Sequence, residues 1–73
     1  MSKKRAPNKV KEYRARLGVS QRILGAAAGV HPNQFPCIEA GVRCRKSTAE
    51  KIAEALGEKV LVIFPDYETF SEG

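Results

Sequence analysis

The sequence has few of the residues that build metal centres, and it lacks long hydrophobic runs. Its 73 residues include two cysteines, Cys37 and Cys44, and one histidine, His31. Because a structural zinc site takes four such ligands, one copy of the chain cannot assemble one. No apolar run approaches the roughly 20 residues that span a bilayer, and residues 1–5 lack the apolar core of a signal peptide. We expect a cytoplasmic protein with no metal, no cofactor and no membrane contact.

The sequence also lacks the patterns that carry common catalytic chemistry. It has no paired carboxylates, no nucleophile beside a general base and no glycine-rich phosphate loop. The two cysteines are either free thiols in a reducing compartment or the halves of a redox-sensing disulfide. We therefore expect a binding protein and not an enzyme.

Acidic residues are scarce in residues 1–46. That stretch contains eleven lysines and arginines but only Glu12 and Glu39 as acids, which gives a net charge of +9. Residues 47–73 contain two lysines and six acidic residues, which gives −4. The pattern predicts a polarised molecule whose basic end faces a polyanion such as DNA, while its acidic end stays solvated or contacts a partner.

Helical periodicity and helix-ending glycines predict a single small all-α domain. Residues 1–6 form a basic arm without an apolar anchor, which we expect to be disordered. A first helix is expected from residue 7 or 8 to residue 17, with Val10, Tyr13 and Leu17 at helical spacing. A glycine follows its last residue.

Residues 20–41 have the pattern of a helix, a glycine turn and a second helix. Ser20 is the expected N-cap of the first helix, Gly29 supplies the turn, and Gly41 ends the second helix. Gly25 either lets two helices approach closely or weakens its own helix, and we favour the close approach. A unit of this size fits a DNA major groove.

Pro36 disturbs the second helix of that segment. If the helix begins at Pro32, Pro36 loses a hydrogen bond and clashes with the preceding turn, at a cost of about 3 kcal/mol. If Asn33 or Phe35 is the N-cap, Pro36 falls in the first turn, where its missing N–H has no partner to lose. We therefore predict a short or kinked helix.

The C-terminal third begins with a basic loop at residues 42–46. Ser47 and Glu50 have the spacing of a capping box for a helix that runs to Leu56. Residues 60–64 form an apolar run that is either a short buried helix or a strand. Residues 67–73 are expected to be a short tail. The buried face of the capped helix is expected to consist of Ala49, Ile52, Ala53 and Leu56.

Several short patterns occur in one order along the chain. They are Val10-x-x-Tyr13-Arg14, Gly18-Val19-Ser20-Gln21, Gly29-Val30, Ile38-Glu39-x-Gly41, Arg45-x-Ser47-Thr48, Lys51-Ile52-Ala53-x-Ala55-Leu56-Gly57 and Phe64-Pro65-Asp66. Together they resemble the DNA-binding domain of the phage repressor and Cro class, the XRE family, over about three quarters of the chain. The resemblance implies a compact five-helix bundle of the lambda-repressor-like helix-turn-helix type over residues 7–66, with its motif at about residues 20–41.

The resemblance also implies roles for individual residues. Arg14 and Glu39 would form an ion pair between the first and third helices, and Gln21 would support the neighbouring helix while it binds a phosphate. The implied base-contacting residues are Pro32, Asn33, Gln34 and Cys37. The implied phosphate-contacting residues are Gln21, Arg43, Arg45 and Lys46, together with Lys3, Lys4 and Arg5 of the arm. The amides of Asn33 and Gln34 either pair with adenine or are simply solvated turn residues.

These features predict a regulator of transcription that binds double-stranded DNA, acting as a repressor on a symmetric operator. The family resemblance places it in a bacterial, phage or plasmid setting and implies a homodimer. The candidate dimer contact consists of Leu61, Val62, Ile63 and Phe64, unless these residues complete the core of the monomer. Two alternatives stay open: the antitoxin of a toxin–antitoxin pair, which grips a protein partner through its C-terminal end, and an interaction module that kept the fold without base recognition.

Overall fold

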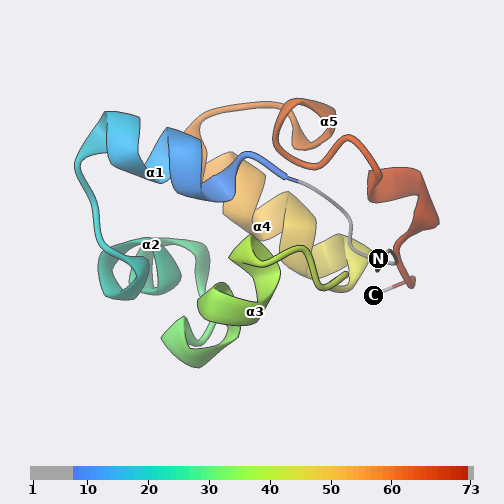
Figure 1. Ribbon diagram of the computed structural model, residues 1–73, viewed down its shortest axis with the longest axis horizontal. Helices are drawn as coiled ribbons and strands as arrows, with labels where there is room; N and C mark the ends of the chain where they lie inside the picture. Colours follow the sequence, from blue (N-terminus) through green and yellow to red (C-terminus); the bar gives the residue numbers. More distant parts are fainter. Residues whose placement is uncertain (1–7, 73) are drawn as a thin grey trace.

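This computed structural model describes residues 8–72, which contain five α-helices and two short 3-10 helices joined by turns and loops (Figure 1). In chain order they are α1 (Val10–Leu17), α2 (Gln21–Ala28), η1 (Pro32–Gln34), α3 (Phe35–Glu39), α4 (Lys46–Leu56), α5 (Val60–Ile63) and η2 (Tyr67–Thr69). The predicted all-α class with five helices is confirmed. The apolar run at residues 60–64 forms a short helix and not a strand. The predicted basic arm with Lys3, Lys4 and Arg5 lies outside the described residues.

Local signals in the sequence set most of the helix ends. The Ser20 hydroxyl accepts a hydrogen bond from the Ile23 N–H at 3.1 Å and caps α2, as predicted. Gly29 ends α2 with a φ of +73°, a left-handed conformation in which a Cβ would be strained. Helix α1 begins at Val10, slightly later than predicted, because the Asn8 side chain accepts from the Val10 N–H at 3.1 Å.

The predicted capping box at Ser47 is wrong. Helix α4 begins at Lys46, so Ser47 lies inside its first turn, and the N-cap residue Arg45 makes no side-chain capping bond. Instead, the Lys46 N–H donates to the Ser71 carbonyl at 2.8 Å. A backbone group from the far end of the chain therefore satisfies one of the donors that the start of a helix leaves without a partner in its own helix.

Helix α4 lies at the centre of the molecule and packs against α1, α2 and α5 (Figure 1). Its predicted buried face is confirmed. Leu17, the last residue of α1, departs from prediction: its side chain is 55% exposed. No helix within residues 8–72 has both the length and the apolar character needed to cross a membrane. The buried core consists of Val10, Leu24, Val30, Phe35, Ile38, Ala49, Ile52, Ala53, Leu56, Ile63, Phe64 and Phe70.

The C-terminal segment, residues 67–72, is packed on the domain and is not a free tail. Phe70 is only 6% exposed, and its ring meets Phe64 edge to face at 5.6 Å between centroids. Ile63 and Phe64 are buried as well, so half of the candidate dimer contact is wrong: these two residues complete the core of the monomer. Leu61 and Val62 remain exposed, at 52% and 37%.

Candidate nucleic-acid interface

Residues 32–39 do not form one α-helix, as the position of Pro36 predicts, and the α-helical part is short. Residues 32–34 form the 3-10 helix η1, and α3 then has only five residues. Pro36 is the second residue of α3, where its missing N–H costs no helical hydrogen bond. The His31 ring caps η1, since its Nδ1 accepts from the Asn33 N–H at 3.1 Å. Asn33 therefore lies inside η1, and Gln34 takes the N-cap position of α3.

Gly25 provides the close approach that was favoured from the sequence. A Cβ built at this position would lie 2.5 Å from the Val30 carbonyl oxygen and 3.3 Å from Cε2 of the Phe35 ring. The same backbone is tied by a hydrogen bond from the Val30 N–H to the Gly25 carbonyl at 2.9 Å. A side chain here would push η1 and α3 away from α2, so the glycine fixes how the two halves of the unit pack.

Glu39, at the end of α3, joins three helices through its carboxylate. Nε of Arg14 on α1 lies 2.9 Å from one carboxylate oxygen, and Nη2 lies 3.3 Å from the other. The side-chain amide of Gln21 on α2 also donates to Glu39, at 3.1 Å. The side chains of Arg14 and Glu39 are only 18% and 8% exposed. The predicted ion pair is confirmed, and so is the support that Gln21 gives to the neighbouring helix.

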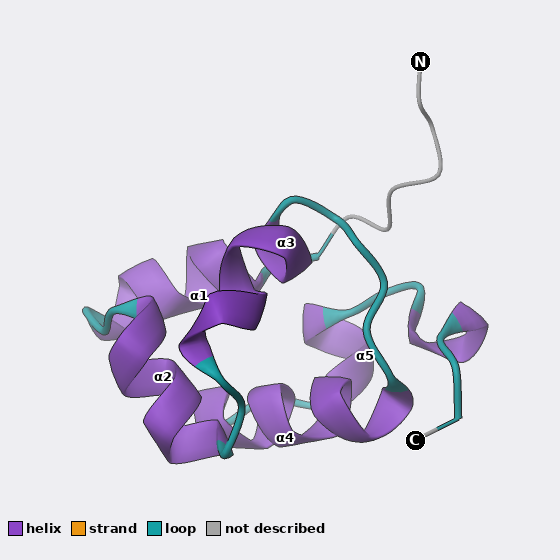
Figure 2. Ribbon diagram, turned by 90° about the horizontal axis from the view of Figure 1, so that it is seen from below, coloured by secondary structure: helices purple, strands orange, loops and turns teal. Residues whose placement is uncertain are grey.

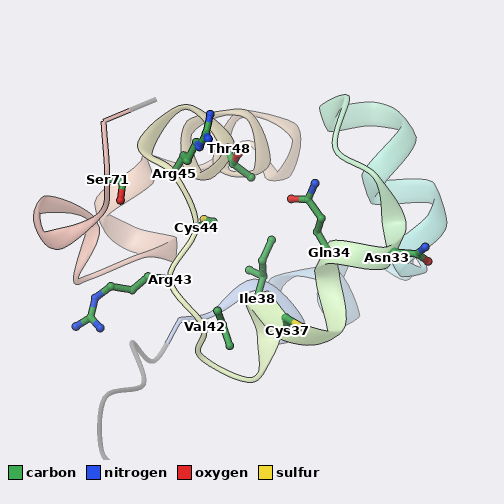
Figure 3. A pocket seen from close by; sticks show the side chains of 10 residues that line it. All are labelled: Asn33, Gln34, Cys37, Ile38, Val42, Arg43, Cys44, Arg45, Thr48 and Ser71. Carbon is green, nitrogen blue, oxygen red and sulfur yellow. The ribbon is translucent and has the colours of Figure 1, made fainter.

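A groove of about 580 Å³ lies between α3 and the connection that leads to α4 (Figure 3). The Gln34 side chain points into it toward Thr48 of α4, whereas Asn33 points away from it (Figure 3). Cys37 and Cys44 are free thiols that come from opposite walls, and burial raises the pKa of the Cys44 thiol. The lining residues are Asn33, Gln34, Cys37, Ile38, Val42, Arg43, Cys44, Arg45, Thr48 and Ser71.

The basic loop, residues 42–46, carries the three cations that were predicted to meet phosphates. The Arg45 side chain lies at the rim of the groove beside Thr48 and is exposed (Figure 3). Arg43 points away from the groove, and its Nε donates to the Thr69 hydroxyl at 2.9 Å. The Lys46 ammonium lies 3.0 Å from the Glu72 carboxylate. The acidic C-terminal part of the chain therefore contacts the basic loop here, through the ion pair between Glu72 and Lys46.

Asn8 is a positioning residue that was not predicted from the sequence. Its Nδ2 donates to the Ile38 carbonyl of α3 at 2.7 Å, while its Oδ1 accepts from the Val10 N–H of α1. Asparagine just before a helix is a known capping signal, so the contact with Val10 was open to prediction. The contact with Ile38 was not, because 30 residues separate the two in the chain.

Metal ligands do not gather at this site: across residues 8–72 no group of three or more His, Cys, Asp or Glu side chains is placed to hold an ion. Comparison of the chain with protein-family models, with curated proteins and with solved structures gave no match. The functional assignment therefore depends on the chain's own residues and their arrangement.

Proposed function

We propose that this protein binds double-stranded DNA sequence-specifically and regulates transcription through a helix-turn-helix unit of the lambda-repressor-like type. The observation that carries the proposal is the arrangement of α2, η1 and α3. The Gly25 contact packs the two halves tightly, and the Glu39 carboxylate ties α3 to both α1 and α2. A pair of helices held at a fixed angle is what a major groove accepts.

The exposed polar residues around this unit divide into two groups by chemistry. Gln34 presents a side-chain amide at the groove, and an amide can pair with adenine through two hydrogen bonds. Arg45 presents a guanidinium at the rim, suited to a phosphate oxygen. Arg43 and Lys46 would add phosphate contacts after leaving their partners on the C-terminal segment. Capture by the cations would then precede base recognition by the amide.

The proposed DNA-bound form is a dimer of two copies of the chain. Helix-turn-helix proteins bind half-sites about 34 Å apart, so a symmetric operator needs two modules. Leu61 and Val62 are the part of the predicted dimer contact that stays exposed on α5. We assign the contact between the two copies to this pair.

Selection of bound sequences from a random duplex pool tests the proposal, with the winners measured again at two salt concentrations. A two-fold symmetric consensus with a steep salt slope is expected. Arg45→Ala should weaken binding to every sequence and reduce the salt slope by about 1, whereas Gln34→Ala should relax base preference. Lys11→Ala is the matched control, because it removes one exposed cation from α1, a helix that contributes no residue to the groove.

Two results would count against the proposal. Equal, uniform losses from Arg45→Ala and Gln34→Ala would contradict the assigned roles. Enrichment of no sequence would overturn sequence-specific binding and favour a protein-interaction module. In that second candidate the exposed apolar pair Leu61 and Val62 would contact a different protein instead of a second copy of the chain.

A further inference from the structure

The C-terminal segment lies alongside the basic loop at the start of α4. Figure 2 shows the extended connection from α3 reaching α4 next to the end of the described chain. Arg45 and Ser71 form a parallel backbone bridge, and the Lys46 N–H donates to the Ser71 carbonyl at 2.8 Å. Phe70 is buried beside them. Backbone pairing and a buried ring therefore hold residues 70 and 71 in place.

Side chains of the same segment engage the cations of the loop. The Glu72 carboxylate lies 3.0 Å from the Lys46 ammonium, which also sits 5.5 Å above the centre of the Tyr67 ring. The Lys46 side chain is 20% exposed, whereas that of Glu72 is 89% exposed. The Glu72 carboxylate is thus open to solvent. Another anion can replace it at the Lys46 ammonium without moving the buried Phe70 ring.

We propose that Glu72 is an intramolecular substitute for a DNA phosphate at Lys46, and that this contact lowers the affinity of the basic loop for polyanions. The inference rests on the proposed DNA-binding function for its biological meaning. A carboxylate on an ammonium group occupies the position that a phosphate oxygen would take, so the nucleic acid must displace it. An exposed ion pair is weak, so removing it should tighten binding by about two- to fivefold.

The test compares Glu72→Gln with Glu68→Gln, which removes the same charge from an exposed position on the same segment. Each variant is made in the wild-type chain and in a Lys46→Gln background. Affinity for a short random-sequence duplex and the salt concentration of elution from heparin are measured for all of them. Glu72→Gln should bind the duplex about two- to fivefold more tightly and elute later than Glu68→Gln. With Lys46→Gln present, the two substitutions should have equal effects.

The outcomes test separately the inhibitory contact between Glu72 and Lys46, which we call the latch, and the proposed DNA-binding function. Equal effects of the two glutamate substitutions on heparin in the wild-type chain would overturn the latch, because general charge would then explain them. Weaker binding by Glu72→Gln would also overturn it and make Glu72 a residue that positions Lys46. Failure of every variant to bind duplex, with the expected order on heparin intact, would refute the DNA-binding proposal and leave the latch standing.

Discussion

Replacing Glu39 with glutamine should destabilise the fold far more than a change of one charge suggests. Three donors, two from Arg14 and one from Gln21, converge on the two carboxylate oxygens. Glutamine offers one oxygen and an amino group, so at least one donor would face another donor. Hydrogen bonds to charged groups are worth about 1.5–3 kcal/mol, and unpairing a fully buried ion costs about 3–5 kcal/mol. Because Arg14 keeps 18% of its side chain in water, we expect about 2–3 kcal/mol.

Thermal unfolding followed by circular dichroism measures this loss. For a domain of this size, 2–3 kcal/mol lowers the Tm by about 10–20 °C. Glu12→Gln is the matched control, since it breaks the pair between Glu12 and Arg16, whose side chains are 51% and 60% exposed. Breaking that exposed pair should cost less than about 0.5 kcal/mol. If both variants melt within 2 °C or so of each other, a difference far below the calculated one, the carboxylate does not hold the three helices together.

The other predictions concern packing and one titration. Gly25→Ala should lower the free energy of unfolding in urea by about 1–2 kcal/mol, because the new Cβ would clash with the Val30 carbonyl. This clash outweighs the better helix propensity of alanine, so a stabilised variant would contradict the close approach. Phe70→Ala should cost about 3 kcal/mol in the same assay, and a neutral result would mean that the C-terminal segment lies outside the core. The hydrogen bond to Glu50 raises the pKa of Tyr67 from 10.0 to about 12. This hydrogen bond therefore stabilises the folded protein fully below pH 10.0, and the stabilisation is lost as the pH rises through about 12. Glu50→Gln should return the phenol pKa toward its ordinary value in an ultraviolet titration, and an unchanged titration would exclude Glu50 as the cause.

The features that the sequence predicted correctly depend on neighbouring residues. Ser20 caps a helix because its hydroxyl reaches an N–H three positions ahead, and Gly29 ends it because of its own φ. The break at Pro36 follows in the same way from a missing N–H and a ring clash. Such effects are decided within one helical turn, so a single sequence is sufficient to predict them.

The features that could not be predicted from the sequence depend on contacts between residues that are far apart in the chain. Ser47 and Glu50 have a valid capping pattern, yet the N-cap is Arg45 and α4 begins two residues earlier than that pattern predicts, where the Lys46 N–H donates to the Ser71 carbonyl. Phe70 looked like part of a tail because nothing local shows that it returns to Phe64. The Arg14 and Glu39 pair was predicted only through the family resemblance, since their spacing of 25 residues has no meaning without a fold.

Helix α3 is so short that residues outside it determine how the candidate DNA-binding surface is oriented. A helix of five residues is far below the roughly 12 that an isolated helix needs, so its own hydrogen bonds do not fix its orientation. Its orientation comes from Asn8 at the Ile38 carbonyl, from the Gly25 backbone beneath Phe35, and from Arg14 at the Glu39 carboxylate. If α3 contacts bases, these residues determine which ones it reaches without touching DNA themselves. Substitutions at such positions would then alter affinity through geometry, and the salt slope, which counts phosphate contacts, would stay unchanged.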